Sequence, residues 1–356
     1  MGKLVIHAAV AAVTLACAAP VVAQTAPMTP ALKELAAAAN KEGELVVTWS
    51  SSTLGGPQGA KAFEDAINKA YGTKIRIKWA PGQSMPNVGN QIAMAYANKL
   101  PSPSDVYLGF SRNMAVLLKQ DIFLQVPWQD YLPDRLTDKI VERGTFVKNT
   151  SSTTGFSYNK KLAPSVPERL EDFLKPEWKG KIATTAFGAG FDQLAGAWGP
   201  DKAMDYAKKF SGQVGGFMRC NEVERMTTGE FLALIFDCSG ASTIEAIEKG
   251  APLARTLSAD IPLISYFYFA VPKNAAHPNV AKLFVTFSAS KEGQKLVWDL
   301  TSSDLHLYPE SKMGQEVAAA EKKYGIKFRD ADIQWQIDNA KANEAQAAIA
   351  KMLSRN

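Results

Sequence analysis

The stretch ELVVTWSSSTLGGPQGAKAFEDAINKAYGTKIRIKW, residues 44–79, decides the class of fold. Its first residues are β-branched and aromatic, and they predict a strand that ends in a polar loop at Ser50. Apolar side chains then recur at helical spacing over residues 58–71, and residues 74–79 alternate like a second strand. This order of strand, loop, helix and strand indicates an α/β fold with a mostly parallel sheet flanked by helices.

The alternation of strands and helices restarts after an extended stretch at 144–158 and closes with a second extended segment at 261–271. Because 356 residues suffice for two domains, we predict two lobes joined by two extended crossings. The predicted first lobe contains residues 24–145 and 270–356, with C-terminal helices free to pack across both lobes, and the second contains 146–269. A ligand would then bind between the lobes, where loops leave the carboxyl ends of strands.

The first residues of the chain indicate export. A positive start with Lys3 precedes an apolar, alanine-rich stretch that ends in small residues at Ala23. We predict a signal peptide at 1–23 that is cleaved after Ala23, and therefore a periplasmic protein. An N-terminal membrane anchor is the alternative, because the apolar stretch approaches spanning length. Lipidation of Cys17 is disfavoured, because the preceding leucine is one position off the usual lipoprotein pattern.

Composition and charge narrow the class of function. Hydrophobic residues make up 46% of the chain and charged residues 21%, values that exclude a disordered or polytopic membrane protein. The formal net charge is only +5, and basic residues are scattered, with no run longer than two. We therefore expect no binding to nucleic acid, whereas a small anion would meet no repulsion.

Cleavage would leave Cys220 and Cys238 as the two cysteines of the mature chain. An exported protein meets an oxidising environment, so these residues are candidates for a disulfide. Two buried, unpaired thiols are the alternative, because the residues between them read as a helix and a strand that could hold the sulfur atoms apart. Neither cysteine belongs to a C-x-x-C pair, which argues against a thiolate metal site.

Several motifs resemble one protein family. They are SDVYLGFSRN at 104–113, TTGFSYNKKL at 153–162, WKGKIATT at 178–185 and AVPKNAAHPNVAKLFVTFSASKEGQKL at 270–296. Together with the exported start, they resemble the periplasmic solute-binding proteins of ABC importers, and more narrowly the type 2 group of ferric-iron-type or family 1 extracellular solute-binding proteins. The resemblance implies a two-lobe protein that captures a small solute and delivers it to a permease in the inner membrane, without catalysis or a cofactor. We expect a monomer.

The resemblance also implies which loops contact the ligand, since they leave strand ends in both lobes and in the second crossing. The predicted ligand-binding residues are Ser50, Ser51, Ser52, Thr53, Ser111, Arg112, Ser152, Thr185, Gly188, Arg219, Asp237, Ser239, Tyr266 and Tyr268.

The chemistry of these residues favours an oxyanion. Hydroxyls, glycines and the N-H groups of helix starts suit a negative charge, although the serines could equally be helix caps. Arg112 and Arg219 are candidates for a forked contact with phosphate or carboxylate. Asp237 would accept from a ligand hydroxyl, or else orient Arg219 or a turn. We therefore predict a phosphorylated sugar, a phosphonate or a carboxylate as ligand.

Two other functions are alternatives. Ferric iron would require tyrosinate and acidic ligands, but the chain after residue 23 has no adjacent tyrosine pair and residues 211–230 contain no tyrosine. Iron capture would need Tyr266 or Tyr268, which period-two geometry puts on one face of a strand, together with distant acids. A secreted hydrolase is the third hypothesis, yet the chain contains no G-x-S-x-G, H-E-x-x-H or Walker motif.

Overall fold

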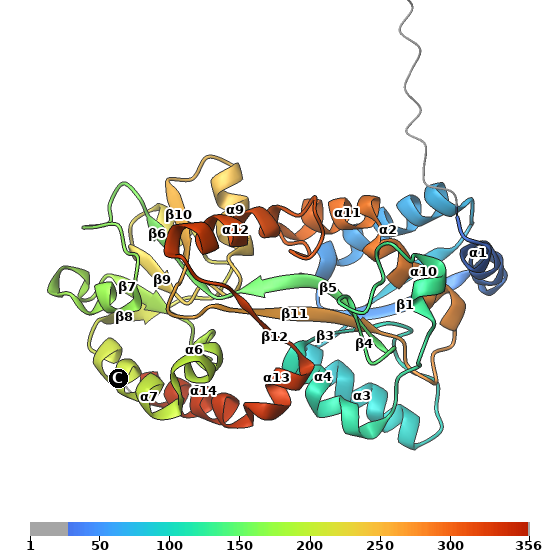
Figure 1. The fold of residues 1–356 in the computed structure, drawn as a ribbon, viewed down its shortest axis with the longest axis horizontal. Helices are drawn as coiled ribbons and strands as arrows, with labels where there is room; N and C mark the ends of the chain where they lie inside the picture. The colour runs from blue at the N-terminus through green and yellow to red at the C-terminus, as the bar shows by residue number, and fades with distance from the viewer. Residues whose placement is uncertain (1–27, 355–356) are drawn as a thin grey trace, which may run out of the picture.

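The structure is a computed structural model that describes residues 28–354. It has two lobes, and Figure 1 shows the long strands β5 and β11 running across the middle between them. The predicted signal peptide at 1–23 lies outside the described residues. Between residues 28 and 354, no helix combines the length and apolar character needed to cross a bilayer.

The first lobe, on the right of Figure 1, is built around the predicted strand-helix-strand unit. Strand β1 alternates buried and half-buried residues, so that Leu45, Val47 and Trp49 face the core, and the apolar side of α2 packs over them through Phe63 and Ile67. The elements before the crossing are α1 (Pro30–Glu42), β1 (Glu44–Trp49), η1 (Thr53–Gly55), α2 (Gly56–Tyr71), β2 (Arg76–Pro81), α3 (Met85–Ala97), β3 (Tyr107–Phe110), α4 (Ser111–Leu117), η2 (Leu118–Gln120), α5 (Trp128–Tyr131) and β4 (Val141–Glu142). Two later helices, α10 (Pro278–Ala289) and α11 (Lys291–Thr301), complete this lobe.

The two crossings are the strands β5 (Phe146–Thr153) and β11 (Leu263–Ala270), which pair antiparallel with Ser151 opposite Tyr266. Strand β11 also pairs with β3 and with β12 (Arg329–Ala331). Every residue of β5 is buried, including its polar second half. The predicted extended segments are therefore confirmed as paired strands rather than as a flexible linker.

The second lobe, on the left of Figure 1, has a sheet in the order β10-β6-β9-β7-β8. Its elements are β6 (Gly155–Asn159), η3 (Leu170–Leu174), η4 (Pro176–Trp178), β7 (Ile182–Thr184), α6 (Phe191–Trp198), α7 (Pro200–Ser211), β8 (Val214–Phe217), α8 (Glu224–Thr227), β9 (Ala233–Ile235), α9 (Ala241–Glu248) and β10 (Leu253–Leu257). The strands β8 and β10 and the helix α9 were not predicted. Strand β8 has two glycines among its four residues, which weaken any strand pattern.

The expectation of mostly parallel sheets needs correction, because the sheets are mixed. Strands joined by helices are parallel, as in the pairs β1-β2 and β7-β8. The crossings and the strands that continue them are antiparallel, as in β5-β11 and β6-β10. The chain enters the second lobe on one crossing and leaves it on the other, and this return path imposes the antiparallel direction.

The C-terminal segment contacts both lobes. Helix α12 (Lys312–Tyr324) lies along the top of Figure 1, and α13 (Ile333–Asp338) and α14 (Ala340–Leu353) lie along the bottom. The helical pattern of residues 332–353 predicts one helix, but the chain breaks at Asn339, whose side chain donates to the Trp335 carbonyl at 2.9 Å. Helix α13 packs on α4, and Trp335 lies against Gly196 of α6, where a β-carbon would come within 2.2 Å of the indole.

The two largest apolar cores support the division into lobes, and a smaller third cluster around Met226 and Leu234 belongs to the second lobe. One core joins the N-terminal elements to α10 and α11, and the other joins the second sheet to α6, α7 and α14. Helix α14 therefore packs with the second lobe through Ala342, Ala345, Ile349 and Leu353. The boundaries at residues 145/146 and 269/270 stay predictions.

Candidate functional site

The loop after β1 holds four consecutive hydroxyls. The Ser50 hydroxyl is hydrogen-bonded to those of Ser52, at 3.2 Å, and Thr53, at 2.8 Å, while Ser51 and Ser52 are exposed. Helix α2 begins after Gly55, which has a left-handed backbone (φ 76°), and no side-chain hydrogen bond caps this helix. The alternative that these serines cap α2 is therefore wrong, and Ser51 and Ser52 are accessible to solvent.

Ser111, at the start of α4, is hydrogen-bonded to the crossing strand β11. Its hydroxyl donates to the carbonyl of Tyr266 at 3.1 Å and accepts from the N-H of the same residue at 3.0 Å. Both contacts are buried, so the Ser111 hydroxyl continues the β3-β11 pairing instead of facing a ligand.

Arg112, the next residue, is half-buried and reaches the C-terminal helix. Its Nη1 donates to the Oε1 of Gln346 on α14 at 2.7 Å. The Nε2 of Gln346 donates in turn to the carbonyl of Gly188 at 3.0 Å. Arg112 and Gly188, predicted from opposite lobes, are thus joined through a residue that sequence analysis did not predict.

The loop after β7 adopts a tight turn at the predicted residues. The Thr185 hydroxyl accepts from the N-H of Ala189 at 2.8 Å. Gly188 has a left-handed backbone (φ 67°), a conformation that favours glycine. A β-carbon there would lie 3.3 Å from the Cβ of Ala350, which shows how closely α14 covers this loop.

Two buried polar residues beside this turn, Asp192 and Gln193, were not predicted as part of the site, whereas Thr184 belongs to a predicted ligand loop at 184–188. Asp192 and Gln193 form the first turn of α6, and each is only 4% exposed. Burial raises the pKa of Asp192, and the nearby charge of Arg112 opposes that shift. The Oε1 of Gln193 and the Oγ1 of Thr184 are buried without a hydrogen-bond partner. The signal that could have found them was their position at the end of a strand and the start of the following helix.

Asp237, at the end of β9, is paired within the protein. Its Oδ2 accepts from the Nε of Arg255 at 2.7 Å and from the Ser157 hydroxyl at 2.9 Å. Arg255 also donates to Glu316 on α12 at 2.6 Å and to the Thr153 carbonyl at 2.9 Å. Burial disfavours the charged form of Arg255. The carboxylates of Asp237 and Glu316 together have the larger effect and raise the pKa of Arg255. Asp237 therefore orients Arg255. The alternative in which it orients Arg219 is wrong.

Arg219 is exposed and lies beside the disulfide. Cys220 and Cys238 are bonded, with Cα atoms 5.9 Å apart, which decides between the two alternatives left open by the sequence. Ser239 follows with a left-handed backbone (φ 107°), a conformation that costs free energy in any residue but glycine. The backbone N-H of Arg219 donates to Glu222, so the backbone of Arg219 belongs to a surface turn.

Tyr266 and Tyr268 lie on one face of β11, as predicted, with ring centroids 6.0 Å apart. Their phenol groups donate to carboxylates, Tyr266 to Asp330 and Tyr268 to Glu142. The ammonium group of Lys148 lies over the Tyr266 ring at 4.3 Å. Burial, with the neighbouring carboxylates, raises the pKa of both tyrosines far above the usual value.

Polar residues of β5 contact the loop before α12. The His306 N-H donates to the Ser151 hydroxyl at 2.9 Å, and that hydroxyl lies 2.7 Å from Nδ1 of the same histidine. Because the hydroxyl accepts from the backbone, its own proton is free to go to Nδ1 of a neutral imidazole. Ser152, the neighbouring predicted residue, is buried opposite Ser265.

Both tyrosines belong to a charged network. Their phenol protons are engaged by Asp330 and Glu142, and the positive charge of Lys148 lies beside these carboxylates. In residues 28–354, no group of three His, Cys, Asp or Glu side chains is arranged to hold a metal ion.

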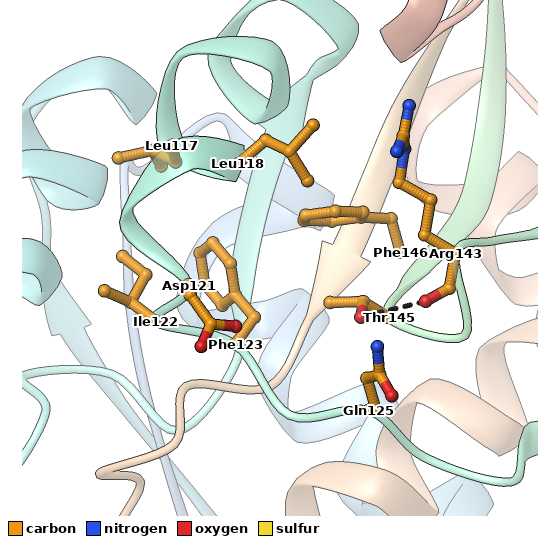
Figure 2. Close-up of a pocket in the computed structure, with 9 residues that line it drawn as sticks. All are labelled: Leu117, Leu118, Asp121, Ile122, Phe123, Gln125, Arg143, Thr145 and Phe146. Carbon is orange, nitrogen blue, oxygen red and sulfur yellow. Dashed lines mark hydrogen bonds between the residues drawn. The ribbon is translucent and has the colours of Figure 1, made fainter.

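One cavity lies apart from the predicted residues. It has a volume of about 220 Å³ and is lined by the end of α4, by η2 and the segment 121–125 that follows it, and by the β4-β5 turn with the start of β5. Figure 2 shows Phe123, Phe146 and Leu118 beside the polar groups of Asp121 and Arg143. None of the predicted ligand-binding residues lines this cavity.

The family of the chain follows from its sequence. A family model described as bacterial extracellular solute-binding protein matches residues 60–324. The chain belongs to this family. The match covers both lobes of this extracellular solute-binding protein, and it confirms the resemblance inferred from the motifs.

Other proteins are similar over most of this solute-binding protein. A protein of Haemophilus influenzae, described only as uncharacterized, is 26% identical over 283 residues, which span 73% of this chain and 77% of the relative. The periplasmic binding protein AfuA of Actinobacillus pleuropneumoniae, with fructose-6-phosphate bound, is 20% identical with a TM-score of 0.62, covering 87% of this chain and 96% of AfuA. Iron-bound HitA of Pseudomonas aeruginosa is 18% identical with a TM-score of 0.60, covering 87% and 99%. At these identities the two structures establish a shared two-lobe fold.

The predicted residues thus fall into several groups within this fold. Arg112 and Gly188 meet through Gln346. Ser111, Tyr266 and Tyr268 lie at the crossing strand β11. The serines after β1 form a group of their own at one strand end. The strongest candidate for a ligand site is the boundary between the lobes around Arg112 and the first turn of α6.

Proposed function

We propose that this solute-binding protein is the periplasmic component of an ABC importer, which captures a small anionic organic solute between its lobes and delivers it to an inner-membrane permease. A phosphorylated sugar, a phosphonate or a carboxylate is the proposed class of ligand. The protein acts as a monomer, binds without chemical conversion of the solute, and reaches the periplasm through cleavage of the signal peptide after Ala23.

The observation that carries the ligand class is the position of Arg112. Its guanidinium lies at the boundary between the lobes, next to the turn at Gly188. The contact with Gln346 uses one of the five N-H donors of arginine, so others are available to an oxyanion. A forked guanidinium suits phosphate and carboxylate groups in particular.

Two further features support an organic anion over iron. Ser51 and Ser52 present exposed hydroxyls at a strand end and are not used as caps of α2. Tyr266 and Tyr268 donate their phenol protons to carboxylates beside a lysine, which disfavours tyrosinate. The bound fructose-6-phosphate of AfuA agrees with the proposed class, whereas the iron of HitA is the alternative within the same fold.

Thermal unfolding with a panel of solutes tests the proposal. A ligand that binds only the folded state raises the melting temperature by mass action. We expect a rise with at least one phosphorylated sugar, phosphonate or carboxylate, and none with ferric citrate. Arg112→Met should weaken binding about ten- to a hundredfold, since a hydrogen bond to a charged group contributes about 1.5–3 kcal/mol.

A matched control separates the site from general charge. Arg76→Met removes an exposed arginine on β2 and should leave binding unchanged. Equal affinity of Arg112→Met and the unaltered protein would contradict the proposed site. A shift with ferric citrate, accompanied by a tyrosinate absorption band, would favour the iron alternative instead.

A further inference from the structure

Two buried side-chain oxygens at the end of β7 and the start of α6 have no hydrogen-bond partner. Thr184 is fully buried at the end of β7, and its Oγ1 has no hydrogen-bond partner. Gln193, in the first turn of α6, buries an Oε1 that also has no partner. Leaving such groups unsatisfied in a folded protein costs about 1–3 kcal/mol each, so their retention calls for an explanation.

Asp192 adds a carboxylate to the same place. It is 4% exposed, lies in the first turn of α6, and is within range of the charge of Arg112. Burial disfavours its charged form and raises its pKa, although the charge of Arg112 and the backbone N-H groups of Gln193 and Asp192 oppose this shift. Among residues 28–354, no side chain donates a hydrogen bond to its carboxylate.

Thr184 lies on the face of β7 that α6 covers. Side chains alternate along a strand, so Thr184 lies on the same face of β7 as Ile182. Ile182 packs in one core with Phe191 and Leu194 of α6. Thr184 therefore faces the helix that carries Asp192 and Gln193.

The charge of a helix start does not account for this arrangement. An acidic residue in the first turn complements the helix dipole equally well when it is exposed. Asp201 has that position in α7 and is exposed. Asp192 is instead buried, precedes Gln193 with its unpartnered oxygen, and lies within range of the charge of Arg112.

We propose that Thr184, Asp192 and Gln193 accept hydrogen bonds from a donor group of the ligand, a hydroxyl or an ammonium, while Arg112 binds its anionic group. This inference rests on the proposed function and narrows it. The solute would then be an anion that also carries hydroxyl or amino groups, and anions without a donor would bind weakly.

Three phosphate esters of similar size provide the test. Propyl phosphate has no donor on its carbon chain, glycerol 3-phosphate has two hydroxyls there, and 3-aminopropyl phosphate has an ammonium group. We expect the protein to bind at least one of the donor-bearing esters about ten- to a hundredfold more tightly than propyl phosphate in titration calorimetry. Preference for one of the two identifies the donor as hydroxyl or ammonium. Butanoate, 4-hydroxybutanoate and 4-aminobutanoate repeat the comparison for carboxylates.

Variants test whether the proposed residues cause the preference for the donor-bearing ester over propyl phosphate. Asp192→Asn keeps the size of the side chain, and we expect it to reduce the preference for the donor-bearing ester at least tenfold. Thr184→Val removes one acceptor at similar volume and should reduce the preference by a smaller factor. Asp201→Asn changes an exposed acid at the start of α7 and should leave the preference unchanged.

The outcomes separate this inference from the proposed function. Tight binding of propyl phosphate or butanoate, with no advantage for the donor-bearing compounds, would overturn the inference but leave anion capture intact. A full preference in both folded Asp192→Asn and Thr184→Val would overturn it as well. Failure of all six compounds to bind would contradict both proposals.

Discussion

Arg112 and Gln346 are 234 residues apart in the sequence and are joined by a hydrogen bond of 2.7 Å between Nη1 and Oε1. The same amide donates from Nε2 to the carbonyl of Gly188 at 3.0 Å. One side chain of α14 thereby connects an arginine of the first lobe to the backbone of the second lobe.

We expect Gln346→Ala to lower the free energy of unfolding by about 2–3 kcal/mol, because a hydrogen bond to a charged group and one to a buried carbonyl are lost together. Glu344→Ala changes an exposed residue of the same helix and should stay within about 0.5 kcal/mol of the unaltered protein. Urea unfolding measures both. Equal effects of the two variants would contradict the connecting role of Gln346.

The buried pair of Arg255 and Asp237 leads to a second prediction. Arg255→Met leaves the Asp237 carboxylate buried with the Ser157 hydroxyl as its remaining side-chain donor, and we expect a loss of about 3–5 kcal/mol in unfolding free energy. The double variant Arg255→Met with Asp237→Asn should recover part of that loss. In the pair of Arg169 with Asp260, the arginine side chain is 53% exposed, and Arg169→Met should cost less than about 1 kcal/mol. A single Arg255→Met variant as stable as the unaltered protein would refute the prediction.

The disulfide between Cys220 and Cys238 should contribute to stability. It closes a loop of 18 residues in sequence separation, and the chain-entropy model gives about 3 kcal/mol for a loop of this size. We expect the double variant Cys220→Ser with Cys238→Ser to unfold at a lower temperature than the oxidised protein. A reducing agent should lower the melting temperature of the unaltered protein and leave that of the double variant unchanged. An equal response of both proteins would rule out this role.

His306 should make stability dependent on pH. Burial lowers its pKa below the ordinary value of 6.5, with the charge of Asp330 acting in the opposite direction. The folded state therefore favours the neutral ring, so this contribution to stability is present above the pKa of the unfolded chain and is lost as the pH falls through the lower pKa of the folded state. We expect His306→Gln to flatten the loss of unfolding free energy between about pH 7 and pH 5. If the unfolding free energies of the two proteins follow parallel curves against pH, this role of His306 is wrong.

Much of the fold was predictable because local patterns determine it. The alternating strand at 44–49 and the apolar spacing of residues 58–71 both reappear, as β1 and α2. The aromatic segment around Tyr266 and Tyr268 is a buried strand with both rings on one face. These features depend on neighbours within a few residues, so the sequence pattern contains them.

The partners of polar side chains could not be predicted in the same way. Asp237 pairs with Arg255 because the strands β6, β9 and β10 lie in one sheet, and β10 was not predicted. Gln346 reaches Arg112 only because α14 folds back over the second lobe. Such contacts are set by tertiary packing, and nothing in the local pattern around each residue specifies them.

The contact of Trp335 with Gly196 provides an optical probe. The indole belongs to α13, which packs on α4, and it rests on the bare backbone of α6 in the opposite lobe. Separation of the lobes at this point would transfer the ring from a protein surface into water and shift its fluorescence to the red. A spectrometer could therefore follow opening and closing in the unlabelled protein.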